Sequence, residues 1–342
     1  MKGFYFKDNN FTEVEIIDKK LIENQVRIQM KNCGICGSDI HYYLHGQNGG
    51  RRILEPLMLG HEFVGQIIEL GPKVSNLKVG DRIIVNPALP CKKCVYCKSN
   101  KANLCINGSF FGSAAKFPHT QGAFREHIEI YESQCHKIFS DVSFEQAAFA
   151  EPLAVALHAT SLIKNYKNKK IIISGCGPIG LLILKILINK TKLENLFVID
   201  VNDNILKAVK KLGITNSVNI STDNKFLNDN DNFFDIAFEA SGNVNSINNI
   251  IGLLSKSGKV IQVGNMPGGL IGIEYNNLML KELNIIGSYR FTKEFNEAVD
   301  AINEKQFNFS DMLTHKFNLQ NCDEAMKIAA NKDLSIKVQV FV

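Results

Sequence analysis

The feature that most limits what this chain can fold into is a glycine-rich turn between an apolar strand pattern and an apolar helix pattern. The turn has the spacing GxGxxG, carried by Gly175, Gly177 and Gly180, and it follows the β-type run 170–174. Glycines at these positions permit a tight turn and let a phosphate approach the backbone at the amino end of the following helix. The context therefore predicts a dinucleotide-binding turn, with a tight turn serving another ligand as the alternative.

The segment 151–284 alternates between strand and helix patterns. A helix pattern runs from Pro178 to about Asn189, and further strand patterns are found at 196–200, 234–239, 259–263 and 285–288, with helix patterns at 203–212 and 244–254. Alternation of this kind predicts a parallel sheet covered by helices on both faces. We therefore expect an α/β fold with a Rossmann-type, doubly wound parallel sheet over residues 151–284.

The segments on either side of this domain have a different pattern. Residues 1–150 show short β-type runs bounded by turn residues, at 14–17, 25–30, 63–70, 82–85 and 124–130. Residues 285–342 show helix patterns at 295–302 and 324–330, and a strand pattern at 336–342. We expect this C-terminal segment to return to the N-terminal one, so that a mainly β domain is discontinuous and the active site lies in a cleft between the two domains.

Composition narrows the class of protein further. The 342 residues carry a net charge of +5 with both signs spread along the chain, which argues against nucleic acid or a membrane as a partner. The apolar run 171–188 is long enough to cross a bilayer, but its glycines, its proline and Lys185 favour a strand followed by a packed helix. The first residues lack the apolar core of a signal peptide, and nine cysteines do not suit a disulfide framework. We expect a cytoplasmic protein.

Four of the cysteines have the spacing of a metal site. They follow the pattern C-x2-C-x2-C-x7-C, carried by Cys91, Cys94, Cys97 and Cys105, within a lysine-rich stretch at about 88–108. Four thiolates suit one tetrahedral zinc with Zn–S distances of ~2.3 Å, and a closed sulfur shell leaves no position for a substrate. The spacing therefore predicts a structural zinc lobe. An iron–sulfur centre and four unrelated cysteines are the alternatives.

A second set of possible metal ligands is spread along the N-terminal half. His61 and Glu62 stand side by side between Gly60 and Gly65, and Cys36 lies in a turn-rich segment upstream. Imidazole, thiolate and carboxylate are common zinc ligands, and a carboxylate can also hold zinc-bound water. Glu151 lies among apolar residues ahead of Pro152, so it is either a helix cap or a further ligand.

Asp200 ends the strand pattern after the glycine turn, twenty residues beyond Gly180. A carboxylate at this place accepts hydrogen bonds from the adenosine ribose hydroxyls and repels a 2′-phosphate. No arginine follows closely, since the next residues are Val201 and Asn202. The sequence therefore favours NAD over NADP, with NADP still possible.

Taken together, these motifs resemble those of the zinc-dependent medium-chain dehydrogenase/reductase family, and the resemblance covers essentially the whole chain. The family's zinc signature is matched by Gly60-His61-Glu62-x2-Gly65-x5-Gly71-x2-Val74. Cys36-Gly37-Ser38-Asp39, together with Glu151-Pro152-Leu153, is similar to the polyol branch typified by sorbitol dehydrogenase. The resemblance implies a GroES-like catalytic domain beside the Rossmann-type domain, two zinc ions per chain and a homo-oligomer, either a tetramer or a dimer.

The resemblance also implies roles for individual residues. Cys36 and His61 match ligands of a catalytic zinc, with Glu62 and Glu151 supplying a carboxylate directly or through water. Ser38 matches the hydroxyl that relays the substrate's proton, and His41 matches the histidine that passes it to solvent. Residues matching the cofactor site are Gly175, Gly177, Pro178, Ile179, Gly180, Asp200, Val263, Gly264, Ser288 and Arg290. Residues matching the substrate pocket are Tyr42, Phe111, Glu151 and Arg290.

The implied substrate is a small sugar acid or polyol. The segments 110–114, 117–119 and 287–292 are similar to the subfamily that oxidises L-idonate to 5-keto-D-gluconate. Arg290 is suited to clamp a carboxylate through two parallel hydrogen bonds, although a surface ion pair is its plainer interpretation. The second hypothesis is a dehydrogenase for sorbitol, xylitol or another polyol. Metal-free reductases and non-enzymatic binding proteins share the fold, but the presence of Cys36, His61 and Glu151 argues against both.

Overall fold

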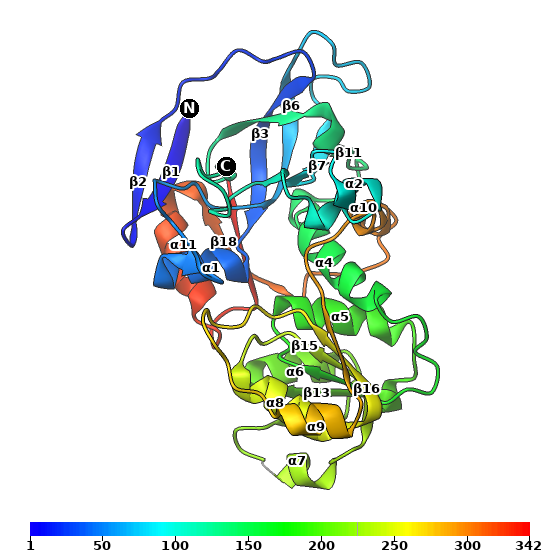
Figure 1. Ribbon diagram of the computed structural model, residues 1–342. Helices are drawn as coiled ribbons and strands as arrows, with labels where there is room; N and C mark the ends of the chain where they lie inside the picture. The colour runs from blue at the N-terminus through cyan, green and yellow to red at the C-terminus, as the bar shows by residue number, and fades with distance from the viewer. Residues whose placement is uncertain (224) are drawn as a thin grey trace. The chain divides into compact units, whose positions relative to one another are not determined.

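The computed structural model describes residues 1–223 and 225–342, and these form two compact units (Figure 1). Unit 1 comprises Met1–Ala154 and Thr292–Val342, and unit 2 comprises Val155–Phe291. The expected boundaries, at residues 150 and 284, lie four and seven residues before these. The second difference has a structural cause, because β17 (Asn284–Gly287) pairs with β16 in the sheet of unit 2. Residues 285–291 therefore belong to unit 2, not to the C-terminal return.

Unit 1 is built on one sheet in which β11, β7, β6, β3, β19 and β18 follow one another, with β10 also paired to β3. The last strand of the chain, β19, lies between β3 and β18, so the C-terminal strand is paired on both sides and is not an edge strand. The strand bounds are β3 Gln25–Gly34, β6 Glu62–Leu70, β7 Arg82–Val85, β10 His127–Tyr131, β11 Cys135–Lys137, β18 Leu313–Asn318 and β19 Lys337–Phe341.

Three short ladders and six helices complete unit 1. The ladders pair β1 (Lys2–Lys7) with β2 (Asn10–Glu15), β4 (Gln47–Asn48) with β5 (Arg51–Arg52), and β8 (Ala88–Leu89) with β9 (Ser109–Phe110). The helices are α1 Gly37–His45, α2 Val95–Lys98, α3 Phe144–Ala147, α4 Ala150–Ser161, which crosses into unit 2, α10 Glu294–Asn303 and α11 Cys322–Ala330. Single-turn 3₁₀ segments cover Ala102–Leu104, Glu132–Gln134 and Leu319–Asn321.

Helix α1 was not among the expected elements, because its sequence has glycines and polar residues where a helix pattern needs an apolar stripe. It forms because Asp39 closes a capping box at its start and because Tyr42 packs into the core. That core is made by the buried residues of β3, β6 and β7 with Phe4, Phe6, Leu57, Leu59 and Phe124.

Unit 2 is a six-stranded, fully parallel sheet in the order β14, β13, β12, β15, β16, β17. The strands are β12 Ile171–Ser174, β13 Leu196–Asp200, β14 Ser217–Asn219, β15 Phe234–Glu239, β16 Leu254–Gln262 and β17 Asn284–Gly287. The helices are α5 Pro178–Ile188, α6 Asp203–Lys211, α7 Lys225–Asp229, α8 Val244–Leu253 and α9 Tyr275–Leu280, with a 3₁₀ turn at Leu193–Asn195. The expected Rossmann-type parallel sheet is confirmed.

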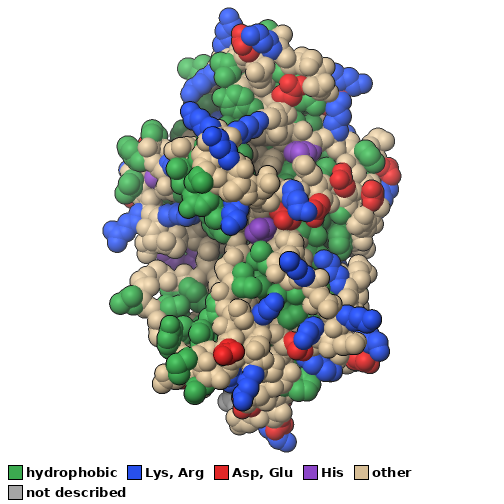
Figure 2. Space-filling view, turned by 45° about the vertical axis from the view of Figure 1, so that its right-hand side comes forward, with side chains coloured by type: hydrophobic (Ala, Val, Ile, Leu, Met, Phe, Trp, Pro, Cys, Tyr) green, Lys and Arg blue, Asp and Glu red, His purple; other side chains and the backbone are tan. Residues whose placement is uncertain are grey.

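The long apolar run is divided as its glycines indicate. Residues 171–174 form β12, and α5 begins only after the glycine turn. Among the described residues, no helix is both long and apolar enough to span a membrane. On the face shown in Figure 2, lysine and arginine side chains are scattered with aspartate and glutamate among them, as the even charge distribution of the sequence predicts.

Candidate active site

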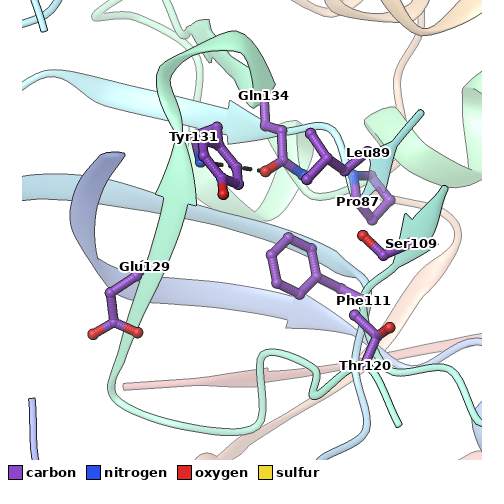
Figure 3. Close-up of a pocket in the computed structure, with 8 residues that line it drawn as sticks. All are labelled: Pro87, Leu89, Ser109, Phe111, Thr120, Glu129, Tyr131 and Gln134. Atoms are coloured by element: carbon purple, nitrogen blue, oxygen red, sulfur yellow. Dashed lines mark hydrogen bonds between the residues drawn. The ribbon is translucent and has the colours of Figure 1, made fainter. Parts of the chain in front are cut away.

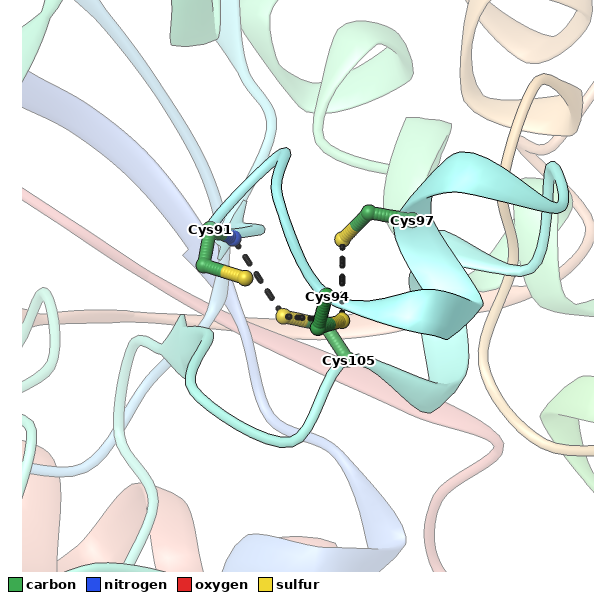
Figure 4. A group of neighbouring side chains, drawn as sticks. All are labelled: Cys91, Cys94, Cys97 and Cys105. Carbon is green, nitrogen blue, oxygen red and sulfur yellow. Dashed lines mark hydrogen bonds between the residues drawn. The ribbon is translucent and has the colours of Figure 1, made fainter.

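The four cysteines of the predicted lobe converge on one point (Figure 4). Their sulfurs all lie within 4.8 Å of one another, and none of them forms a disulfide. Cys94 Sγ is 3.6 Å from Cys97 Sγ and 3.9 Å from Cys105 Sγ, and the backbone N–H of Cys91 donates to Cys105 Sγ over 3.2 Å. A backbone hydrogen bond at Cys97 lowers the pKa of the Cys94 thiol to about 6, which favours a thiolate. The group has the chemistry and spacing to hold a structural zinc.

A second group brings together Cys36, His61 and Glu62, whose ligand atoms also lie within 4.8 Å of one another. The sheet explains how residues 25 positions apart meet. Antiparallel pairing sets Gly34, at the end of β3, opposite Glu62, at the start of β6. Cys36 lies two residues beyond the end of β3, and His61 directly precedes β6. His61 and Glu62 are buried and Cys36 is half-buried.

Asp39 lies behind this group and joins the two segments that carry it. One carboxylate oxygen accepts from the backbone N–H of Cys36 over 3.0 Å, and the other accepts from the N–H of Gly60 over 3.3 Å. The same oxygen that faces Gly60 is 3.7 Å from His61 Nδ1. A carboxylate behind a ligating imidazole orients the ring and raises its basicity. Asp39 had no predicted role, although its place in the Cys36–Asp39 motif indicated that it lies near the metal ligands.

Lys337 is the second residue that sequence reasoning missed. This lysine of β19 is buried, forms an ion pair with the Glu62 carboxylate, and donates to the carbonyl of Ile35 over 2.9 Å. Burial disfavours its charged form, but Glu62 and Cys36 prevail and raise the pKa of Lys337. A lysine inside the mostly apolar run 336–342 was the signal for a buried charge.

The charges around the group fit a bound cation. Burial, with a contribution from Glu62, raises the pKa of the Cys36 thiol to about 12 in the absence of metal. Burial likewise raises the pKa of Asp39. A thiol and several carboxyl groups therefore surround one buried lysine, and a divalent metal ion would satisfy the remaining acceptors and favour the thiolate. The residues present thus fit a zinc site.

Glu151 lies close enough to influence this group but outside it. Its carboxylate is buried and is not among the ligand atoms that lie within 4.8 Å of one another. Burial raises the pKa of Glu151 to about 8, with Glu62 and Cys36 adding to the shift and His61 opposing it. Helix α4 begins at Ala150, so Glu151 lies in its first turn and does not occupy the cap position. Of the two carboxylates left open by the sequence, Glu62 lies with Cys36 and His61.

Ser38 and His41 lie one turn apart on α1. Ser38 is half-buried and its side chain hydrogen-bonds the Cys36 thiol, whereas His41 is exposed. Partial burial and the neighbouring His45 lower the pKa of His41, so its imidazole is mostly neutral at pH 7 and able to accept a proton. Residues three positions apart share a helix face. The Ser38 hydroxyl, which contacts the Cys36 thiol, and the exposed imidazole of His41 therefore lie on the same side of α1.

Two predicted pocket residues are engaged elsewhere in unit 1. Tyr42 is buried, and its hydroxyl oxygen accepts from the backbone N–H of Ala114 over 3.1 Å. Phe111 packs edge-on against Phe63, with ring centroids 5.4 Å apart. It also lines a cavity of about 180 Å³ that none of the predicted metal ligands lines; the other walls are Pro87, Leu89, Ser109, Thr120, Glu129, Tyr131 and Gln134 (Figure 3).

The aromatic residue beside the predicted metal ligands is Phe110, whose ring centroid lies 5.5 Å from that of His61. Phe110 is buried, and its strand β9 pairs with β8. The resemblance had indicated its neighbour Phe111 as a residue of the substrate pocket. Because residues 110 and 111 are both phenylalanine, composition alone could not tell which side chain faces the imidazole. The pairing of β9 determines it.

In unit 2 the glycine turn has the conformation that the sequence predicts. Gly175 has φ +81°, and a Cβ there would lie 2.6 Å from the Ser241 side chain. A Cβ at Gly180 would lie 2.2 Å from the carbonyl oxygen of Gly175, so both positions require glycine. Nothing lies within 4 Å of a Cβ at Gly177, which leaves the amino end of α5 open to a phosphate. The turn fits a dinucleotide.

The other predicted cofactor residues lie at the same edge of the sheet. Asp200 Oδ2 accepts from the backbone N–H of Cys176 over 2.6 Å, so this carboxylate anchors the glycine turn itself. Val263 and Gly264 follow β16, and the N–H of Ser288 donates to the carbonyl of Gln262 over 2.9 Å. Arg290 has φ +54°, and its guanidinium carbon lies 4.9 Å from the Tyr289 ring centroid.

Comparison with known proteins identifies the class. The family model for the alcohol dehydrogenase GroES-like domain matches residues 22–140, and the model for zinc-binding dehydrogenases matches residues 178–304. The chain therefore belongs to the zinc-dependent medium-chain dehydrogenase/reductase family, with a GroES-like catalytic domain and a Rossmann-type domain, and it fits the polyol branch.

Individual relatives agree with this assignment. The chain is 35% identical over 318 residues to L-idonate 5-dehydrogenase (NAD(P)(+)) of Escherichia coli K12, covering 93% of this chain and 92% of the relative. It is 29% identical to a sorbitol dehydrogenase of Bacillus subtilis 168, covering 93% and 90%. The crystal structure of the E. coli K-12 L-idonate 5-dehydrogenase superposes with a TM-score of 0.91 at 34% identity, covering 100% of this chain and 97% of that one.

Proposed function

We propose that the protein is an NAD(P)-dependent dehydrogenase that oxidises the C5 hydroxyl of L-idonate to 5-keto-D-gluconate in a reversible reaction. The observation that carries this proposal is the buried group of Cys36, His61 and Glu62, because it is the ligand chemistry of an open zinc site. The 35% identity over 93% of the chain supports the choice of substrate. The second candidate is a sorbitol- or xylitol-type dehydrogenase, supported by the 29% identity to the sorbitol enzyme.

The proposed roles follow from the side chains. Cys36, His61 and a carboxylate from Glu62 or Glu151 would hold a catalytic zinc, and Cys91, Cys94, Cys97 and Cys105 would hold a structural one. When bound, the catalytic zinc supplies a Lewis acid that makes an alcohol easier to deprotonate. Ser38 would accept the substrate's proton and pass it to His41, which is exposed and can release it to solvent.

The cofactor and substrate residues divide between the two units. The glycine turn 175–180 would hold the pyrophosphate, and Asp200 would stabilise the ribose while it anchors Cys176. A hydride would then pass from the carbinol carbon to the nicotinamide ring. Arg290 would bind the carboxylate of a sugar acid, and Glu151 would contact the substrate. Tyr42, whose hydroxyl already binds Ala114, would contribute its ring, not a hydrogen bond.

The test is a comparison of ketose substrates. Initial rates of NADH consumption by the zinc-replete protein are measured with 5-keto-D-gluconate, D-fructose and D-xylulose. A higher kcat/KM for the keto acid would support L-idonate as the substrate. Preference for a neutral ketose would move the protein to the sorbitol-type enzymes and leave its family unchanged. An absence of activity on all three would contradict both candidates.

A further inference from the structure

A buried polar network in unit 2 surrounds a carboxylate that the proposed mechanism does not use. Glu239 ends β15 and is 0% exposed. Its Oε1 accepts from the Ser241 N–H over 2.9 Å, the Gly242 N–H over 3.1 Å and the Ser246 hydroxyl over 3.0 Å, and it also accepts from the Ser241 hydroxyl. Its Oε2 accepts from Gln262 Nε2 over 2.6 Å. Among the described residues no lysine or arginine pairs with it.

The place of Glu239 in the sheet is informative. Strand β12 has β13 on one side and β15 on the other, so the order of the strands changes direction between β12 and β15. In open parallel sheets, ligands bind at this switch point, outside the carboxyl ends of the strands. Register pairs Ser174 with Glu239, and Glu239 with Gln262. Glu239 therefore lies at the switch point, one layer beneath the surface that a dinucleotide would contact.

Glu239 also connects the two backbone segments that are predicted to contact the cofactor. On one side, Ser241 packs so closely on Gly175 that a Cβ at Gly175 would lie 2.6 Å from it. On the other side, the carbonyl of Glu239 accepts from the N–H groups of Val263 over 2.8 Å and Gly264 over 2.9 Å. A Cβ at Gly264 would lie 2.3 Å from the Gly242 nitrogen. The glycine turn, residues 239–242 and the Val263-Gly264 segment are therefore in close contact, and the distances between them depend on this network.

The chemistry requires a carboxylate. The carboxylate of Glu239 accepts from five donor groups, all N–H or O–H, and the Gly242 N–H contacts both of its oxygens; an ionised carboxyl group offers about four lone-pair sites and no donor. A glutamine amide in its place would turn its NH2 group toward some of these N–H and O–H donors, which then have no acceptor on that side. A buried charge without a cation is costly unless hydrogen bonds compensate it, so a sheet that needed only mechanical support would not require one.

We propose that Glu239 is a positioning residue for the dinucleotide: it fixes the spacing between the glycine turn 175–180 and the Val263-Gly264 segment. This inference rests on the proposed function, since it needs a dinucleotide to bind unit 2. Glu239 is fully buried and touches no ligand itself. Its loss should therefore weaken binding of a ligand that spans both segments more than binding of one that uses only the adenosine side, near Asp200.

The experiment uses zinc-replete, full-length protein and three variants. Glu239→Gln removes the negative charge and replaces one acceptor oxygen with an NH2 donor, and Ser246→Ala removes one donor, a hydroxyl that also lies 2.7 Å from the Ser174 hydroxyl. Asp235→Asn is the matched control, because Asp235 lies at the opposite end of the same strand and joins it to the start of β12 through Lys169 Nζ (2.8 Å) and Lys170 N (2.9 Å). Dissociation constants are measured for NADH and for 5′-AMP, together with melting temperatures.

We expect Glu239→Gln to raise the Kd for NADH by roughly tenfold and Ser246→Ala by about threefold, within the range of net losses expected for individual hydrogen bonds. Asp235→Asn should leave it within about twofold, and 5′-AMP should bind all variants within about twofold of the wild type. If Glu239→Gln does not fold, the dissociation constants of Ser246→Ala test the inference instead.

Two results would overturn the inference. The first is an unchanged Kd for NADH in Glu239→Gln, or in Ser246→Ala if Glu239→Gln does not fold. The second is an equal loss of affinity for NADH and for 5′-AMP. The second result would mean that the network only stabilises the domain. Failure of the wild-type protein to bind NADH is a different outcome. It would overturn the proposed function, and this inference with it.

Discussion

The two candidate metal sites of unit 1 are built in opposite ways. The four-cysteine lobe takes all its ligands from residues 91–105, a short and mostly exposed segment. The Cys36 group takes its ligands from the end of β3 and the start of β6, and is completed by Asp39 behind it and Lys337 from β19. A local site can form from sequence spacing alone, whereas the second site exists only when three strands are paired. The comparison predicts that the first site serves folding and the second serves chemistry.

The largest expected effect tests that division directly. Cys36→Ser should abolish turnover, a loss of at least about a thousandfold, because a proposed ligand of the catalytic metal is removed while the fold remains. Cys94→Ser should mainly lower the melting temperature, because a structural zinc contributes folding free energy. Steady-state rates, metal content and thermal unfolding are measured for both variants. Equal melting temperatures with an equal loss of activity would refute the division.

The second prediction concerns the buried cation. Lys337→Met should lower the free energy of unfolding by about 3–5 kcal/mol, because it leaves the Glu62 carboxylate buried without its partner. The matched change in the lobe is Lys93→Met, which removes an exposed lysine and should stay within about 0.5 kcal/mol of the wild type. Urea unfolding of the zinc-free proteins measures both. A comparable effect of the two changes would remove the contrast between the sites.

The third prediction is a pH dependence of the metal-free protein. Glu151 has a pKa raised to about 8 in the folded state, so the unfolded chain releases its proton at lower pH than the folded one. The unfolded state then binds fewer protons, and stability should fall between about pH 5 and pH 8, by on the order of 4 kcal/mol. Glu151→Gln should abolish this slope in urea unfolding. The same slope in the variant would assign it to another group.

The smallest expected effect tests whether the Tyr42 hydroxyl stabilises the fold or binds the substrate. Tyr42→Phe should cost about 1 kcal/mol of stability, because the buried N–H of Ala114 loses its acceptor. Tyr96→Phe, at an exposed position of the lobe, should change stability by less than about 0.5 kcal/mol. The KM of the preferred substrate should be unaltered in Tyr42→Phe. A clear rise in KM without a loss of stability would place the hydroxyl on the substrate instead.

Many elements could be predicted because their determinants are local. The glycine turn, with Pro178 at the start of α5, and the alternating strands of unit 2 each carry a pattern that needs no distant partner. Helix α1 was missed, because its stability comes from the Asp39 capping box and the burial of Tyr42. The strand at 285–288 was also predicted, but the domain boundary was placed before it, at residue 284, because its pairing partner, β16, cannot be identified from the sequence of β17 alone.

The two-domain α/β class, the four-cysteine lobe, the dinucleotide turn, and Cys36 and His61 as candidate ligands of one metal could be predicted from the sequence. The surroundings of that site came only from the tertiary structure: Glu62 lies within the group and Glu151 outside it, Phe110 lies beside His61, and Lys337 is the buried counter-charge. The physical reason is the same in each case. Spacing along the chain sets which ligand types are available, but strand register and burial set which of them meet and at what charge.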